Sequence, residues 1–444
     1  MVALIAAGRA GAQGAAPDRP GVRTNETSRD VSLLDRVPAL APFKIRSFRY
    51  QWPSDLLASW AFEMEGVILG WFVLVSTGSV LALALFGSLQ FLGTLVSPLF
   101  GMAGDRIGNR RLLCLMRGTY LAIAACLAAL FLAGLATPAA VFGLATVMGL
   151  VRPSDITMRN LLIGETMPAD DLMRAMGVSR TTADSARVVG ALTGAGLVAA
   201  LGSGLAYVAV CLFYAASLAL TFRVGVQRLR VVAEAPASPL RALGEGFSYV
   251  WSIPETRALM LLAFLVNLAA YPLVGSLLAY VARNVYGLDQ TGLGWLLASF
   301  SAGALAGSIA VSTHGAGIRP ARTMLSCAMG WFAINLAFSW IQSPGWGALA
   351  LFCAGFVQSF CQIPMAVLLL RGTEPAFRGR VMGVRMLAVY GLPLGLLLAG
   401  PGVERLGFAV TASLFSVTGL VFTAAIAWTW RTRLWHPGAE ANTR

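Results

Sequence analysis

Acidic side chains interrupt the first long apolar stretch of the chain. Asp55, Ser59 and Glu63 recur at intervals of four residues, so a helix places them on one face. Trp60 flanks that face, whereas Glu65 points elsewhere. At a rise of about 1.5 Å per residue, Glu63 lies roughly 20 Å into a helix that begins near position 50. A carboxylate at that depth is costly unless it is protonated, paired or facing a water-filled cavity.

Each of the two acidic residues has two interpretations. Glu63 either exchanges a proton during a functional cycle or forms a static ion pair with an arginine of a neighbouring helix. Asp55 is two turns shallower, and it either contacts a substrate or cation at the membrane surface or is a solvated carboxylate near Arg49. We predict Glu63 and Asp55 as proton-coupling candidates. Ser59 and Trp60 are candidates for the wall of a cavity.

Arginine and aspartate alternate along one side of two further apolar stretches. Their spacing of three or four residues lets each aspartate pair with the arginines around it on a helix. The two groups are Arg152, Asp155 and Arg159, and Arg180, Asp184 and Arg187. Both continue into apolar sequence, so we expect an interhelical network that either acts on substrate or protons or pairs structurally. The proton-coupling candidates are Arg152, Asp184 and Arg187, and the cavity candidate is Asp155.

Uncharged polar side chains occupy two later apolar stretches. Asn267 and Tyr271 lie one helical turn apart, as do Gln358 and Gln362. Among phenylalanine, methionine and leucine they suit a large amphiphilic ligand, or they hydrogen-bond one helix to another. We predict all four as candidates for the cavity wall.

The composition is that of a membrane protein. Of 444 residues, 57% are hydrophobic and 12% are charged, against about 25% charged in soluble domains. The net charge of +13 is explained by arginines in cytoplasmic loops, so no nucleic acid partner is expected. The six cysteines and two histidines are scattered, which predicts no metal site. With no clustered catalytic motif and no phosphate-binding loop, we predict neither an enzyme nor a bound cofactor.

Twelve apolar runs have about the 20 residues needed to cross a bilayer. They are placed at residues 50–76, 80–104, 112–133, 138–160, 176–199, 203–224, 257–281, 292–313, 322–341, 346–370, 379–401 and 406–430. Arginines gather in alternate connections, so both termini are predicted to be cytoplasmic. The predicted organisation is a disordered tail (1–45), a six-helix bundle (46–224), a linker with an amphipathic helix (225–256), a second six-helix bundle (257–430) and a tail (431–444).

A short polar segment separates the second and third runs. It reads Gly-Met-Ala-Gly-Asp-Arg-Ile-Gly-Asn-Arg-Arg over residues 101–111, and its charges require a membrane surface. The segment resembles the signature of the major facilitator superfamily at Gly101, Asp105, Arg106, Gly108, Arg110 and Arg111, with Asn109 in place of a basic residue. The halves also echo each other, because Arg-Ala-Met-Gly-Val at 174–178 recurs as Arg-Val-Met-Gly-Val at 380–384.

The resemblance implies an all-α integral membrane fold. In it, two six-helix bundles related as parallel repeats rock around a central cavity lined by helices 1, 4, 7 and 10. The resemblance also implies that Asp105 latches the two bundles together by contacting the start of helix 11, where the helix dipole favours an anion. The six matching hairpin residues are therefore candidates for a gating motif.

We therefore predict a secondary transporter of a small organic molecule in the cell inner membrane, driven by the proton gradient. Trp71, residues 77–79 and residues 378–380 resemble the branch of siderophore and drug exporters, which favours proton-coupled efflux. Gly190 and Gly194 keep only part of an antiporter signature. Uptake or facilitated passage of an organic or lipid-like solute, and a non-transporting sensor, therefore stay open. The expected partners are the substrate and the lipid bilayer, and the expected state is a monomer.

Overall fold

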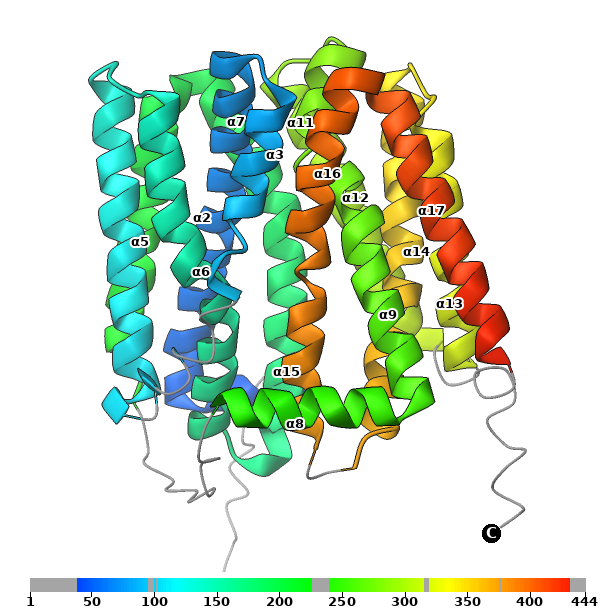
Figure 1. The fold of residues 1–444 in the computed structure, drawn as a ribbon. Coiled ribbons are helices and arrows are strands. Elements are labelled where there is room, and N and C mark those ends of the chain that lie inside the picture. The colour runs from blue at the N-terminus through cyan, green and yellow to red at the C-terminus, as the bar shows by residue number, and fades with distance from the viewer. Residues whose placement is uncertain are drawn as a thin grey trace, which may run out of the picture.

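The fold is a bundle of long helices. The computed structural model describes residues 38–94, 100, 103–104, 106–225, 239–314, 319–374 and 377–431, and every regular element in these ranges is a helix. Figure 1 shows most helices standing side by side along one direction, while α8 (Pro239–Ser252) lies crosswise at one end. Parallel helices satisfy their own backbone hydrogen bonds, as a chain crossing a bilayer requires.

The first half of the bundle, residues 46–224, follows the predicted runs closely. Its elements, with the short helix before them, are η1 (Pro38–Lys44), α2 (Arg46–Thr77), α3 (Val80–Leu89), α5 (Asn109–Leu132), α6 (Pro138–Thr166) and α7 (Ala169–Phe222). The predicted run 80–104 differs, because α3 ends at Leu89 and a turn follows at residues 90–92.

The second half, residues 257–430, follows α8. Its elements are α9 (Pro254–Ala269), α10 (Tyr271–Val274), α11 (Leu278–Tyr280), η2 (Val281–Val285), α12 (Gln290–His314), α13 (Pro320–Phe338), α14 (Pro344–Arg371), α15 (Arg378–Ala388), α16 (Gly391–Leu406) and α17 (Phe408–Thr429). The segment η2 is a turn of π-helix. The predicted run 379–401 is divided, because α15 and α16 are separate helices.

Two glycines break the chain sharply between neighbouring helices. Gly202, with φ 77° and ψ 169°, interrupts α7 so that the element consists of two helices. Gly407, with φ 81° and ψ 166°, separates α16 from α17. This region of backbone conformation is essentially restricted to glycine. The predicted runs 176–199 and 203–224 are therefore distinct helices within one continuous element.

By length and composition, nine segments of the described residues are apolar enough to cross a membrane. One of them, residues 175–222, contains the break at Gly202 and so covers two predicted runs. The nine do not include the predicted runs 80–104 and 322–341. The protein is thus an all-helical, multi-pass membrane protein.

Each half has an apolar core. One core is built only from residues between Ala61 and Val224, whereas the larger core joins the second half to residues of α2, α3 and α7 that pack against it. Contacts between the halves run from α3 to α16 and from α7 to α12. Arg283 Nη1 also donates to the Leu74 carbonyl oxygen at 2.9 Å. α3 and α11, which leads directly into Arg283, lie in the part of the bundle away from α8 (Figure 1).

Glycines allow the closest helix contacts in both halves. A Cβ at Gly149 of α6 would lie 2.0 Å from the Leu89 carbonyl oxygen of α3. A Cβ at Gly355 of α14 would lie 2.0 Å from the Phe300 carbonyl oxygen of α12. Gly355 follows Gly149 by 206 residues, the same interval that separates the similar segments 174–178 and 380–384.

The predicted linker helix is present as α8. It contacts α9 and α15 of the second half. Glu245 lies 3.3 Å from Arg380, and the ring of Tyr249 stacks on Phe377 with 4.4 Å between centroids. The crosswise helix is therefore attached to the second half.

Candidate functional site

A cavity of about 180 Å³ lies between the two halves, and we call it the central cavity. Its polar wall residues are Glu63, Gln90, Arg152 and Ser276. Its apolar wall includes Phe62, Phe86, Leu293 and Leu297. Few polar groups in an apolar wall are typical of a site for an organic molecule.

Glu63 has both of the surroundings that its sequence position predicted. Its side chain is 35% exposed and lines the central cavity. Its Oε1 also lies 3.9 Å from Arg187 Nε, and Arg187 Nη1 donates to Asp184 Oδ1 at 3.4 Å. The Glu63 carboxylate therefore has an arginine partner and also faces an open cavity. Proton coupling by Glu63, Asp184 and Arg187 stays a prediction, and the side chain of Arg180 lies outside the described part of the structure.

Asp55 is not a solvated carboxylate at a membrane surface. It is 5% exposed, and its Oδ1 forms an ion pair with Arg117 of α5 and lies 3.7 Å from Arg159 Nε. Arg159 in turn pairs with Asp155. We call Asp55, Arg117, Asp155 and Arg159 the buried quartet. Two acids and two bases balance, which offsets the cost of burying each charge.

Arg49 does not reach Asp55, because it donates to the carbonyl oxygens of Phe43 at 2.8 Å and Lys44 at 3.1 Å. Arg117 pairs with Asp55 instead, and it also donates hydrogen bonds to Ser54 and Thr221. The sequence contains the signal, since Arg117 stands within the predicted run 112–133 and a lone arginine there needs an acidic partner.

The predicted arginine and aspartate ladder on α6 divides between two environments. Asp155 is fully buried beside Arg159, so it does not line the central cavity. Arg152 turns the other way, donating from Nη1 to Gln90 Oε1 at 2.8 Å and lying 4.7 Å from the Phe62 ring centroid. Of the three residues, only Arg152 is placed to meet a substrate.

Ser59 and Trp60 bind other helices and not the central cavity. Arg159 Nη1 donates to Ser59 Oγ at 2.6 Å, and Trp60 Nε1 donates to Thr193 Oγ1 at 2.6 Å. Gly190 lets α7 approach here, since a Cβ on it would lie 2.6 Å from Glu63 Cβ. Both side chains therefore fix α2 against α6 and α7.

The uncharged candidates of the second half mostly join helices. Gln358 Nε2 donates to Tyr271 Oη at 2.6 Å, linking α14 to α10. Arg385 Nη2 donates to Gln362 Oε1 at 3.4 Å. Asn267 Nδ2 donates within its own helix at 2.8 Å. None of the four lines the central cavity, so a role in substrate binding stays a prediction.

The hairpin is only partly described. Gly101 and Asp105 lie outside the described residues, and with them the predicted contact to helix 11. Arg106 and Arg111 are exposed, Gly108 has φ 90° at the start of α5, and Arg110 Nη1 donates to the Val224 carbonyl oxygen at 2.9 Å. Asn109, which stands where the signature has a basic residue, donates from Nδ2 to Glu165 Oε1 at 2.7 Å. Arg110 thus ties the start of α5 to the end of the first half.

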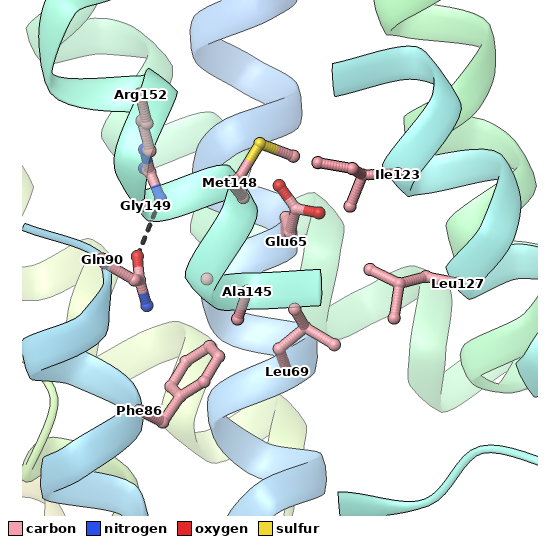
Figure 2. A pocket seen from close by; sticks show the side chains of 11 residues that line it. Glu65, Leu69, Phe86, Gln90, Ile123, Leu127, Ala145, Met148, Gly149 and Arg152 are labelled. Carbon is pink, nitrogen blue, oxygen red and sulfur yellow. Dashed lines mark hydrogen bonds between the residues drawn. The ribbon is translucent and has the colours of Figure 1, made fainter. Parts of the chain in front are cut away.

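A second void, of about 10 Å³, lies beside Glu65. Figure 2 shows the Glu65 carboxyl group pointing into the first half, with Arg152 and Gln90 on one side of the void. Glu65 is 4% exposed. Tyr214 donates to its Oε2 at 3.0 Å and Tyr207 to its Oε1 at 3.3 Å. Glu65 leaves the face of Glu63, as the helical period predicts, and the same rotation about the helix directs it into the bundle.

Comparison with known proteins identifies one family. Residues 52–396 match the family model of the Major Facilitator Superfamily. The multidrug efflux pump Tap of Mycolicibacterium fortuitum is 27% identical over 372 residues, which cover 78% of this chain and 86% of Tap.

Solved structures share the fold at low sequence identity. The transporter PepTSo of the POT family has a TM-score of 0.70 and 13% identity, covering 87% of this chain and 98% of its own. The nucleoside transporter NupG has a TM-score of 0.68 and 13% identity, covering 87% and 100%. The human organic anion transporter MFSD10 has a TM-score of 0.63 and 18% identity, covering 86% and 99%.

Proposed function

The chain belongs to the major facilitator superfamily, and on that basis we propose that it is a proton-driven exporter of drug-like organic molecules in the cell inner membrane. Its likeness to the efflux pump Tap favours export. The observation that carries the proposal is the central cavity, where Glu63 and Arg152 stand among aromatic and aliphatic side chains between the two halves. Such a wall suits an amphiphilic substrate that bears a charge.

We infer twelve membrane spans arranged as two parallel repeats of six. The break at Gly202 supports two spans in α7. The paired contacts at Gly149 and Gly355, separated by the interval of the sequence echo, support the repeat. With arginines in the loops on the side of α8, both termini are cytoplasmic.

The contacts between the halves support a cavity that opens toward the cytoplasm. Ser88 Oγ donates to the Pro393 carbonyl oxygen at 3.2 Å, and Arg283 to that of Leu74. The Arg283 contact joins the halves at the end away from α8, and the Ser88 contact lies deeper, at the inner end of α3. Rocking of the halves about the central cavity would open the end away from α8 and close the other.

Proton movement in everted membrane vesicles tests the proposal. A respiration-driven pH gradient is monitored with a fluorescent dye while lipophilic cations such as tetraphenylphosphonium, neutral drugs and organic acids are added. We expect a compound that is exported to discharge the gradient in vesicles with the wild-type protein. The variant Glu63→Gln should transport cations poorly, because the cavity loses its acidic wall residue.

Glu404→Gln is the matched control, since it makes the same chemical change at an exposed position of α16. It should behave as wild type. Uptake of labelled substrate that needs no pH gradient would contradict the proposal and favour a facilitative carrier. Absence of any response with correctly inserted protein would favour a non-transporting relative.

A further inference from the structure

We propose that Glu65 binds the driving proton in a site separate from the substrate, and that Arg152 transmits its charge state to the central cavity, where Glu63 faces the cation. The proposal rests on the proposed function and deepens it. It starts from the placement of Glu65, a buried carboxyl group that faces the interior of the first half while Glu63 faces the cavity.

The partners of Glu65 suit both of its protonation states. Tyr207 and Tyr214 hydroxyl groups donate to the carboxylate oxygens. A tyrosine hydroxyl can also accept a hydrogen bond, so the same pair can accept from the protonated acid. An arginine bound directly to Glu65 would instead favour the charged form alone. The site is therefore built to gain and lose a proton.

The charges around Glu65 come from few elements. The titratable and charged groups that act on it are Tyr207, Cys211 and Tyr214 of α7 and Arg152 of α6. Tyr120 of α5 packs against Tyr214 with 5.7 Å between ring centroids. The remaining wall is formed by uncharged groups of α2, α5 and α6 and of α3 with the Gln90 that follows it, including Leu69, Ile123 and Met148. Arg152 is thus the one residue of this set with a permanent charge.

Arg152 connects the two sites. The wall residues common to the central cavity and the Glu65 void are Gly66, Phe86, Gln90 and Arg152. At Gly66 an added Cβ would meet nothing within 4 Å, so the backbone of α2 leaves this boundary open. Arg152 donates to Gln90 here and also attracts Glu65 across the void. A short rotation of its side chain exchanges one partner for the other.

The exchange couples a proton to a cation. When Glu65 loses its proton to water, its negative charge draws Arg152 away from the central cavity, which becomes more favourable for a cation beside Glu63. When Glu65 binds a proton, it becomes neutral, and Arg152 returns to Gln90 and repels the cation. One proton is bound as one cation is released, which is the order that antiport requires. The hydrogen bond from Arg152 to Gln90 corresponds to the protonated state.

Infrared difference spectroscopy tests the proton site directly. Spectra of the purified protein at high and low pH should contain the carbonyl stretch of a carboxylic acid that forms at low pH. This band should be missing in Glu65→Gln, which keeps the side-chain volume, and present in Glu63→Gln. An unchanged band in Glu65→Gln would overturn the assignment, whether or not the protein transports anything.

Binding of tetraphenylphosphonium tests the coupling. Wild-type affinity should fall about tenfold between about pH 8 and about pH 5.5, within the usual range for coupled sites. Glu65→Gln should bind weakly at every pH, and Arg152→Gln should bind tightly at every pH. Glu63→Gln should bind more weakly than wild type but keep the pH dependence.

The two variants Glu65→Gln and Arg152→Gln are expected to shift affinity in opposite directions, which mere loss of folding would not produce. Loss of pH dependence in Glu63→Gln with its retention in Glu65→Gln would assign the proton to Glu63 and overturn the proposal. If the wild-type protein moved no protons with any substrate while the infrared band depended on Glu65, the export proposal would fail and the proton site would stand.

Discussion

Gly149 and Gly355 occupy matching places in the two halves, and in each case the helix backbone touches a neighbouring helix so closely that no side chain fits. Gly202 and Gly407 likewise share almost the same backbone angles. In backbone geometry the halves are therefore alike at two independent places.

Their buried side chains are not alike. Every buried charged residue of the described part of the chain belongs to the first half, namely Asp55, Glu65, Arg117, Asp155 and Arg159. Buried polar residues of the second half are uncharged, and they include Asn335, Gln358, Ser416 and Thr423. Charges inside a membrane protein are costly, so close glycine packing is common to both halves whereas buried charge, in the described part of the chain, is confined to one.

The largest effect is expected from breaking the buried quartet. Arg117→Ala leaves the two buried acids Asp55 and Asp155 with Arg159 as their one basic partner in the quartet, and removing one partner of a buried pair costs about 3–5 kcal/mol. Loss of monodisperse protein and a lower Tm in detergent would measure this. Arg111→Ala, an exposed position on the same helix, should leave Tm nearly unchanged. An equal fall in Tm in the two variants would show that the buried quartet contributes no more to stability than an exposed arginine does.

Overfilling the shared glycine contacts should have a smaller effect that is similar in both halves. Gly149→Val and Gly355→Val force backbone apart, and overpacking of this kind typically costs about 1–3 kcal/mol. Gly143→Ala on α6, where a Cβ meets nothing within 4 Å, is the control. Thermal unfolding of the three variants compares them. A large loss in only one half would contradict the likeness of the two contacts.

The smallest effect is expected from the uncharged pair of the second half. Tyr271→Phe removes the acceptor of the hydrogen bond from Gln358, and such bonds between membrane helices contribute about 0.6 kcal/mol on average. The Tm should fall slightly and vesicle transport should persist. Abolished transport in Tyr271→Phe would show that the uncharged polar residues of the second half are also needed for transport, which would contradict the difference drawn between the halves.

Much of the fold could be predicted because apolar length and loop charge are local properties of the sequence. The run 138–160 begins at the residue where α6 begins, and the linker predicted to carry an amphipathic helix, residues 225–256, contains α8. The departures arise where tertiary contact ends a helix inside apolar sequence. At Leu89 and Gln90 the backbone contacts Gly149 of α6, and the apolar pattern of α3 does not predict that contact.

The site was harder to predict because helix position alone does not determine which neighbour a side chain meets. Asp55, Ser59 and Glu63 do share one side of α2, but the three contact Arg117, Arg159 and Arg187 respectively. Burial of Glu65 depends on two tyrosines about 150 residues later in the chain. Pairing each buried charge with every possible partner would have found Arg117.

The short helix α3 has a mechanical consequence. It packs against α16 at the end where the halves meet, and at its own end it presents Gln90, the partner of Arg152. Because Gln90 and Arg152 both belong to the first half, rocking of the halves would carry this hydrogen-bonded pair past Ser276 and Leu293 of the opposite cavity wall. The ten residues of α3 therefore tie the helix contact between the halves to one wall of the central cavity, so opening the bundle at this end would shift the polar groups that face a substrate.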